Sequence, residues 1–192
     1  VLSGAASVLA LFLAQALLAP AHAQQPQPPE VAARAYLVMD ITANQILASK
    51  DIDAPVEPAS LTKLMTAMVV LDSKLPLDDT IVINADDVHI YAKSRLAGGT
   101  VLTREEALLL ALMSSENRAA YTLGRNYPGG ITAFVDAMNR KARELGMDHS
   151  HFADPTGLLS ENVASAEDLT RMLSAAYQYK MIREFSTWPD LT

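Results

Sequence analysis

The sequence contains no cysteine among its 192 residues. Disulfides, zinc–thiolate centres, iron–sulfur clusters and thiol nucleophiles are therefore excluded. Basic residues are also scarce: 15 Lys and Arg stand against 22 Asp and Glu, the formal net charge is -7, and no basic run occurs. Because a phosphate backbone is bound mainly by clustered Lys and Arg, no nucleic-acid binding is expected. Half of the residues are hydrophobic, which is enough for one domain with a sizeable core.

Charge is absent altogether from the first 23 residues, and residues 8–19 are apolar apart from Gln15. This apolar run is too short to span a bilayer comfortably, and the small-x-small pattern Ala21-His22-Ala23 follows it. We predict a secretory signal over residues 1–23, cleaved after Ala23, with an uncleaved membrane anchor as the alternative. A complete signal starts with Met and carries positive charge, so we expect the N-terminus to be incomplete.

The predicted mature chain begins with a leader and continues as one domain. Residues 24–34 start with a segment rich in Pro and Gln, which has nothing to bury and is expected to be extended or flexible. The domain is predicted over residues 35–192. Its first element is a β-hairpin, because the short apolar runs 35–39 and 46–49 flank a polar turn.

Helical spacing of apolar residues dominates the rest of the chain. Thr103 and Glu106 form a predicted capping box, Gly146 is placed to end a helix, and Ser165 is placed to begin the last one. The elements predicted are helices over 60–71, 104–113, a segment after Ser114, 131–145 and 165–177, a strand over 80–83, and irregular chain over 84–100. One hairpin and one strand leave sheet faces uncovered, so further strands are expected downstream.

The first candidate catalytic motif is Ser60-Leu61-Thr62-Lys63, at the start of a helix. Residues i and i+3 are neighbours on one helical face, so the two polar side chains can meet. A serine hydroxyl becomes a good nucleophile when a base takes its proton, and a lysine can be that base when burial favours its neutral amine. The helix start also directs backbone N–H groups at a developing oxyanion. The motif alone is weak evidence, since serine is common at helix starts.

The second motif is the polar break Ser114-Ser115-Glu116-Asn117 between two apolar helical segments. Taken alone, it is an ordinary turn between helices. Together with the first motif it predicts a proton relay by Ser115 toward a leaving amine, and an Asn117 that orients Lys63 and binds a substrate carbonyl.

These motifs resemble those of low-molecular-mass penicillin-binding proteins of the D-alanyl-D-alanine carboxypeptidase family, peptidase family S11. The resemblance is strongest to the D-alanyl-D-alanine endopeptidase (penicillin-binding protein 7) branch. It covers residues 35 to the C-terminus and includes SENRAA (115–120), YPGG (127–130), FVDAMN (134–139) and DPTGL (154–158). By this resemblance Ser60 is the acyl-ester nucleophile, Lys63 its proton acceptor, and Ser115 and Asn117 the second catalytic element.

The resemblance implies an α/β (α+β) fold of the DD-peptidase/β-lactamase type, with a helical subdomain and an antiparallel sheet. The Lys-Thr-Gly motif of the family occurs nowhere in the sequence, so we expect it and the C-terminal strands to lie beyond Thr192. The implied substrates are D-alanyl bonds of peptidoglycan stem peptides in the periplasm, with a role in cell-wall biogenesis and cell shape. β-Lactam antibiotics are the implied acylating inhibitors, no cofactor is needed, and peripheral association with the membrane or cell wall is allowed.

The sequence leaves two other functions open. A serine β-lactamase would use the same Ser60 and Lys63 with a glutamate-held water, for which Glu161 is the nearest candidate, although its context does not match that family. The second alternative is that the chain is an inactive, non-enzymatic fragment of the family. Metal binding by His149 and His151 is not expected, because a spacing of two is poor for chelation and no third ligand is evident.

Overall fold

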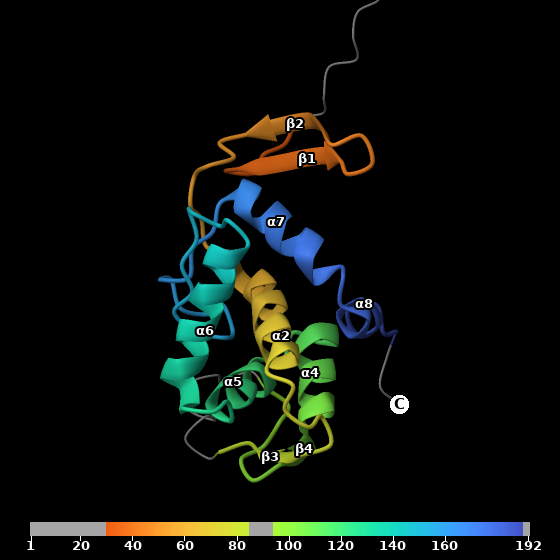
Figure 1. Cartoon of the computed structure of the whole chain (residues 1–192), viewed down its shortest axis with the longest axis vertical. Coiled ribbons are helices and arrows are strands. Elements are labelled where there is room, and N and C mark those ends of the chain that lie inside the picture. The colour runs from red at the N-terminus through yellow and green to blue at the C-terminus, as the bar shows by residue number, and fades with distance from the viewer. Residues whose placement is uncertain (1–29, 85–93, 190–192) are drawn as a thin grey trace, which may run out of the picture. The chain divides into compact units, whose positions relative to one another are not determined.

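The computed structural model describes residues 30–84 and 94–189 (Figure 1). The predicted signal over 1–23 and most of the predicted leader over 24–34 lie outside the described residues. The chain divides into two units, residues 1–32 and 33–192, and the account below concerns the second. In the described part of the chain, no helix has the length and apolar character needed to cross a membrane.

The predicted hairpin is confirmed. Strands β1 (Tyr36–Asp40) and β2 (Gln45–Lys50) pair antiparallel, with a register shift between Val38 and Met39. The Asp40 carboxylate closes the turn by accepting the backbone N–H groups of Thr42 at 2.8 Å and Ala43 at 3.0 Å. Strand β1 contacts the helices at α7 (Ala166–Ala176).

Helix α2 (Thr62–Asp72) lies at the centre of the helical part and contacts all the other described helices (Figure 1). A 3-10 turn, η1 (Ala59–Leu61), precedes it. The surrounding helices are α4 (Arg104–Met113), α5 (Asn117–Arg125), α6 (Gly130–Glu144), α7 and α8 (Lys180–Ser186). Their apolar faces close one core, whose largest fully buried side chains include Met65, Met68, Leu108, Phe134, Met138, Met147, Phe152 and Met172. Methionine fills much of this core because its unbranched side chain adapts to irregular gaps.

Local signals in the sequence set the helix ends. The capping box is present: Thr103 Oγ1 accepts the Glu106 N–H at 3.1 Å, and Glu106 Oε2 accepts the Thr103 N–H at 2.7 Å. Ser165 caps α7 by accepting the Asp168 N–H at 3.1 Å. Gly146 follows α6 with a φ of 69°, the left-handed conformation that glycine adopts without strain.

Two elements were not predicted. Strand β4 (Val101–Thr103) pairs antiparallel with β3 (Thr80–Val82), directly after the segment 84–100 predicted as irregular chain, most of which lies outside the described residues. Helix α8 follows α7, so the prediction that Ser165 begins the last helix was wrong. With seven residues, no side-chain cap and only Ile182 and Phe185 buried, α8 is too short to show a helical period in the sequence.

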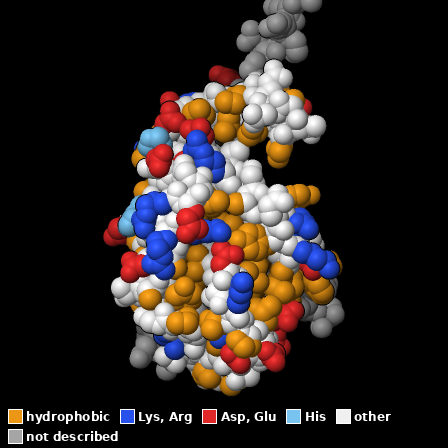
Figure 2. Space-filling model, viewed as in Figure 1, with side chains coloured by type: hydrophobic (Ala, Val, Ile, Leu, Met, Phe, Trp, Pro, Cys, Tyr) orange, Lys and Arg blue, Asp and Glu red, His pale blue; other side chains and the backbone are white. Residues whose placement is uncertain are grey.

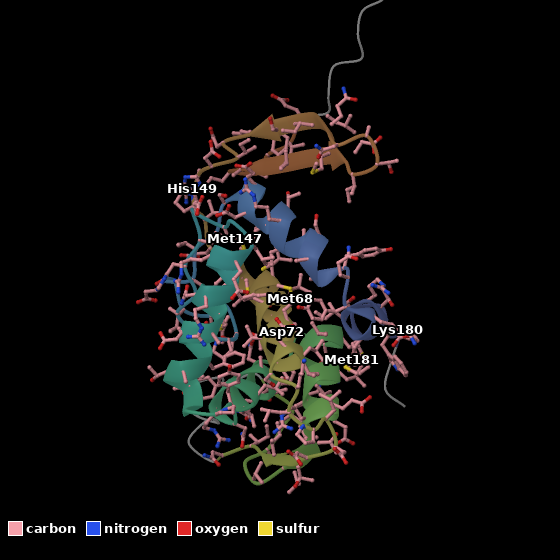
Figure 3. All side chains as sticks on the ribbon, viewed as in Figure 1. Met68, Asp72, Met147, His149, Lys180 and Met181 are labelled. Carbon is pink, nitrogen blue, oxygen red and sulfur yellow. The ribbon has the colours of Figure 1, made fainter. Side chains whose placement is uncertain are left out.

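A polar cluster ties the end of α2 to two neighbouring segments. The carboxylate of Asp72, labelled in Figure 3, accepts from Lys141 of α6 at 2.8 Å and from the Tyr179 hydroxyl at 2.7 Å. The hydrogen bond to Asp72 raises the pKa of Lys141, and burial raises that of the Tyr179 phenol. These bonds therefore fix α6 and the start of α8 on the helix that begins next to Ser60.

Candidate active site

Ser60 lies in the η1 turn, at the edge of an open pocket of about 460 Å³. Its side chain is exposed, and the preceding Ala59 has a φ of 47°, a left-handed conformation that is strained for a residue with a Cβ. The pocket is lined by Pro58, Ala59, Ser60, Leu61, Lys63, Leu64, Ala111, Leu112, Ser115 and Ser186. Ser186 comes from α8, so the helix that the sequence did not reveal forms part of the pocket wall.

Lys63 lies one turn further along, on the same side as Ser60, as the spacing predicts. Its Nζ donates to Ser60 Oγ at 3.3 Å and to the Thr156 carbonyl at 2.9 Å. The residue is only 2% exposed, because α2 carries it into the helical core. The lysine therefore contacts the serine hydroxyl from the buried side, while the other side of the hydroxyl faces the pocket.

Burial lowers the pKa of Lys63 from 10.5 to about 8, against the opposing effect of the negative charges of Asp154 and Glu116. At pH 7 a pKa near 8 leaves roughly one lysine in ten neutral, compared with roughly one in three thousand at the ordinary value. A neutral amine at hydrogen-bond distance from a hydroxyl can accept its proton. The site thus supplies a base in useful amount without any other titratable group.

Ser115 is the third member of the cluster. Its Oγ lies 2.6 Å from Ser60 Oγ, and either hydroxyl can be the donor. The residue lies between α4 and α5 with a φ of 56°, a second left-handed residue beside the pocket. Helix α4 ends where the Ser114 and Glu116 N–H groups both bond to the Leu110 carbonyl, which turns the Ser115 side chain toward the η1 turn.

Asn117 is placed differently from the other predicted site residues. It is the first residue of α5 and is half-buried. Within the described residues no hydrogen bond joins it to Lys63, whose second partner is the Thr156 carbonyl instead. Its predicted roles, orienting Lys63 and binding a substrate carbonyl, stay predictions.

Residues 154–157, part of the DPTGL segment that carries the family resemblance, form a turn close to Ser60. Gly157 has a φ of 82°, and a Cβ there would lie 1.9 Å from the Ala59 carbonyl oxygen. The turn therefore packs directly against the backbone next to Ser60. Only glycine allows this approach.

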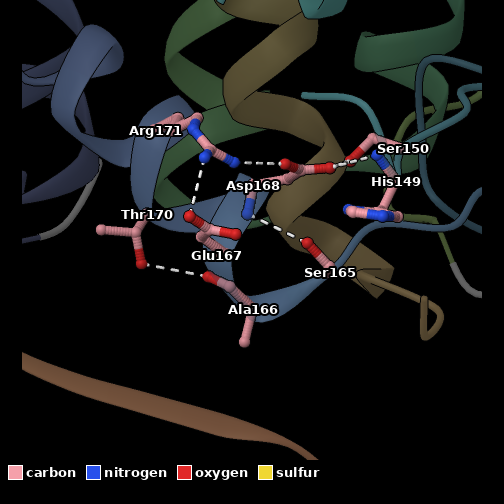
Figure 4. A network of polar contacts seen from close by, with 8 residues as sticks. All are labelled: His149, Ser150, Ser165, Ala166, Glu167, Asp168, Thr170 and Arg171. Atoms are coloured by element: carbon pink, nitrogen blue, oxygen red, sulfur yellow. Dashed lines mark hydrogen bonds and ion pairs between the residues drawn. The ribbon is translucent and has the colours of Figure 1, made fainter. Parts of the chain in front are cut away.

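A network of polar contacts secures the chain ahead of this turn (Figure 4). The buried carboxylate of Asp168 accepts from the His149 N–H and the Ser150 hydroxyl, both at 2.8 Å, and from Arg171 at 2.7 Å. Asp168 thereby joins the segment after α6 to the first turn of α7. Sequence reasoning assigned no role to Asp168.

His149, His151 and Glu161, the other candidate residues, do not line the Ser60 pocket. Among the described residues, no three His, Asp or Glu side chains lie close enough together to hold a metal ion. His151 pairs with Val163 through its backbone. Glu161 is exposed, bonds to Ser160 at 3.2 Å and does not line the Ser60 pocket. No described contact therefore gives Glu161 the water-holding role that a β-lactamase would require.

A serine whose hydroxyl contacts a buried lysine on one side and a second serine on the other is the arrangement expected of enzymes that form an acyl-serine with lysine as base. Comparison with known proteins is in accord with that class. The family model described as D-alanyl-D-alanine carboxypeptidase, peptidase family S11, matches residues 22–190, and the chain belongs to this family.

Relatives within the family include two named D-alanyl-D-alanine endopeptidase. The one from Pseudomonas aeruginosa is 48% identical over 188 residues, which cover 96% of this chain and 61% of that protein. The one from Escherichia coli is 43% identical, with 92% and 57% covered. The chain thus spans about three fifths of the length of these two relatives.

Solved structures share the fold. A D-alanyl-D-alanine carboxypeptidase from Mycobacterium tuberculosis superposes with a TM-score of 0.79 at 29% identity, over 88% of this chain and 65% of that one. The Streptomyces K15 DD-transpeptidase superposes with a TM-score of 0.76 at 30% identity, with 83% and 66% covered. The predicted DD-peptidase-type α/β fold is confirmed.

Proposed function

We propose that the protein is a serine DD-peptidase that hydrolyses D-alanyl peptide bonds of peptidoglycan through an acyl ester on Ser60. The observation that carries the proposal is the contact of a buried Lys63 with the Ser60 hydroxyl inside an open pocket. The family of the chain and the names of its relatives support the same chemistry. No step requires a metal or a cofactor.

In the proposed reaction, neutral Lys63 accepts the Ser60 proton as Ser60 Oγ attacks the D-alanyl carbonyl carbon. The tetrahedral intermediate collapses to an acyl ester and expels the amine, which needs a proton. The Ser115 hydroxyl, 2.6 Å from Ser60 Oγ, is placed to pass a proton to that amine, and it is reprotonated with the proton that Lys63 took from Ser60. Water then attacks the ester and gives a proton to neutral Lys63; the bond to Ser60 Oγ breaks, the acyl group leaves as the carboxylic acid, and Ser60 Oγ regains a proton from Lys63.

The preferred bond is proposed to be the cross-link between D-alanine and the diaminopimelate of a neighbouring stem peptide. Three relatives named endopeptidase are 48%, 43% and 34% identical, whereas those named carboxypeptidase are 28% to 34% identical. We also propose that the protein acts in the periplasm; a cross-linked peptidoglycan substrate and the predicted signal over residues 1–23 support this location. The pocket is also proposed to accept β-lactams as acylating inhibitors.

The test is to incubate the full-length protein with cross-linked muropeptide dimers and, separately, with free pentapeptides. An endopeptidase converts dimers to monomers and leaves pentapeptides largely intact, whereas a carboxypeptidase releases D-alanine from pentapeptides. Ser60→Ala should abolish both activities, because the nucleophile is lost. Equal turnover by Ser60→Ala would overturn the proposal, and rapid hydrolysis of penicillin would favour a β-lactamase.

A further inference from the structure

The turn at residues 154–157 contacts α2 through two backbone carbonyls. The Pro155 carbonyl accepts the Thr66 hydroxyl at 2.7 Å, and the Thr156 carbonyl accepts Lys63 Nζ at 2.9 Å. Both donors are fully or almost fully buried, so neither carbonyl can be replaced by water without rearrangement. The position of the Lys63 amine therefore depends on the conformation of this turn.

The Asp154 carboxylate fixes that conformation from inside. It is 3% exposed and accepts the Gly157 N–H at 2.9 Å and the Asn162 side-chain amide at 2.6 Å. Its second oxygen accepts the Thr156 hydroxyl. The bond to the Gly157 N–H holds the peptide unit that contains the Thr156 carbonyl, and the bond to the hydroxyl holds the Thr156 side chain, so Asp154 sets the direction of that carbonyl.

Asn162 completes the arrangement from the far end of the loop. Its amide oxygen accepts the Ala153 and Asp154 N–H groups at 3.0 and 3.2 Å, and its amide nitrogen also donates to the Leu159 carbonyl at 2.9 Å. The side chain is fully buried, with every partner in one loop. A buried amide satisfied in this way holds one geometry, because any other leaves polar groups unpaired.

We propose that Asp154, held by Asn162, is a positioning residue for the reaction at Ser60: it keeps the Thr156 carbonyl on the Nζ of Lys63. The proposal rests on the proposed function, in which Lys63 is the base. Asp154 contacts none of the reacting atoms and acts through the turn. Its hydrogen-bond partners in the described chain are neutral, so its negative charge is left to act on the nearby lysine.

That charge gives the proposal a distinct signature. Two carboxylates, Asp154 and Glu116, act on Lys63, and both raise its pKa against the larger lowering by burial. Glu116 lies at the start of α5, where its side chain accepts the Arg118 N–H. When the Asp154 charge is removed, only the charge of Glu116 still opposes the effect of burial, so the pKa of Lys63 falls further.

The experiment uses Asp154→Asn in the full-length protein and a fluorescent penicillin as probe. The second-order rate constant for acylation of Ser60 is measured from acid to alkaline pH. The rate constant rises with pH as Lys63 loses its proton, and we call this rise the acid limb and the constant value above it the alkaline plateau. We expect the acid limb to move to lower pH, because the pKa of Lys63 falls. We expect the alkaline plateau to fall by about tenfold or more, because the lysine is less well placed. The variant is nearly isosteric, and its thermal unfolding shows whether it folds.

A second variant separates the effect of the hydrogen bonds of Asp154 from the effect of its charge. Thr156→Val removes the hydroxyl that binds Asp154 and keeps both carboxylates, so the plateau should fall while the acid limb stays in place. Glu161→Gln is the matched control, since it removes an exposed charge from the same loop and should change neither.

Several results would overturn the positioning role. One is an Asp154→Asn variant whose acylation rate constant and pH dependence equal those of the wild type. Another is an Asp154→Asn variant whose rate constant is lowered by the same factor at every pH, which indicates a structural role only. A Thr156→Val variant that reacts at the wild-type rate is the third. If the wild type itself is not labelled at Ser60, the proposed function fails. If the wild type is labelled and one of the three results above is obtained, only the positioning role fails.

Discussion

Helix α2 and the β1–β2 hairpin make opposite use of their apolar residues. Eight of the eleven α2 residues are buried, whereas neither hairpin strand contains a buried residue. An apolar groove of about 670 Å³ lies along β1 and α7. Figure 2 shows hydrophobic side chains exposed on one face of the molecule. Within the described residues, the hydrogen-bond partners of the Ser60 side chain are Lys63 of α2 and Ser115 between α4 and α5, and neither comes from the hairpin. Stability and acylation should therefore depend on that part far more than on the hairpin.

The largest effect is expected in the helical core. Phe134 is fully buried and packs edge-on against Tyr127, with ring centroids 5.3 Å apart. Phe134→Ala should lower the free energy of unfolding by about 3–5 kcal/mol, because it removes buried contacts and leaves a cavity. Denaturant unfolding measures the change. A loss below about 1 kcal/mol would mean that the core is not closed as described.

Gly157→Ala is expected to lower acylation strongly, although Gly157 is not one of the proposed catalytic residues. The new Cβ would overlap the Ala59 carbonyl, so the turn and the backbone beside Ser60 must separate. We expect penicillin acylation to fall by about 100-fold. Gly146→Ala is the control, since that glycine also has positive φ but open space around it. If both variants are acylated at the wild-type rate, the close approach has no role.

Thr66→Val tests the second carbonyl that α2 holds. The substitution keeps the shape of the side chain and leaves the buried Pro155 carbonyl without its donor. The free energy of unfolding should fall by about 1–3 kcal/mol. Thermal unfolding, with the acylation rate as second readout, measures it. Unchanged stability would show that the carbonyl finds another partner.

The smallest effect is expected in the hairpin. Ile46 is 51% exposed, so Ile46→Ala removes little buried area and should change the free energy of unfolding by about 0.5 kcal/mol or less. The acylation rate should stay at the wild-type value. A loss as large as that of Phe134→Ala would contradict the contrast between the two regions, and would indicate that the hairpin strands are covered in solution.

Local signals explain what could be predicted from the sequence. Ser60 and Lys63 are three residues apart on one helix, so their contact follows from helix geometry, and Thr103 and Ser165 mark helix starts by their own side chains. The contact of Lys63 with Thr156 joins residues 93 apart in the chain. Backbone carbonyls have no residue signature, so this contact could not be predicted from the sequence. Helix α8 was missed because seven residues carry too little periodicity.

The most direct test of the account is the pH dependence of penicillin acylation of the full-length protein, with the adduct located by peptide mapping. We predict one adduct, on Ser60 and absent from Ser60→Ala. Its rate constant should rise as pH increases through about 8, where Lys63 loses its proton. An adduct on another residue, or a rate constant that is flat across this range, would contradict the assignment of Lys63 as the base.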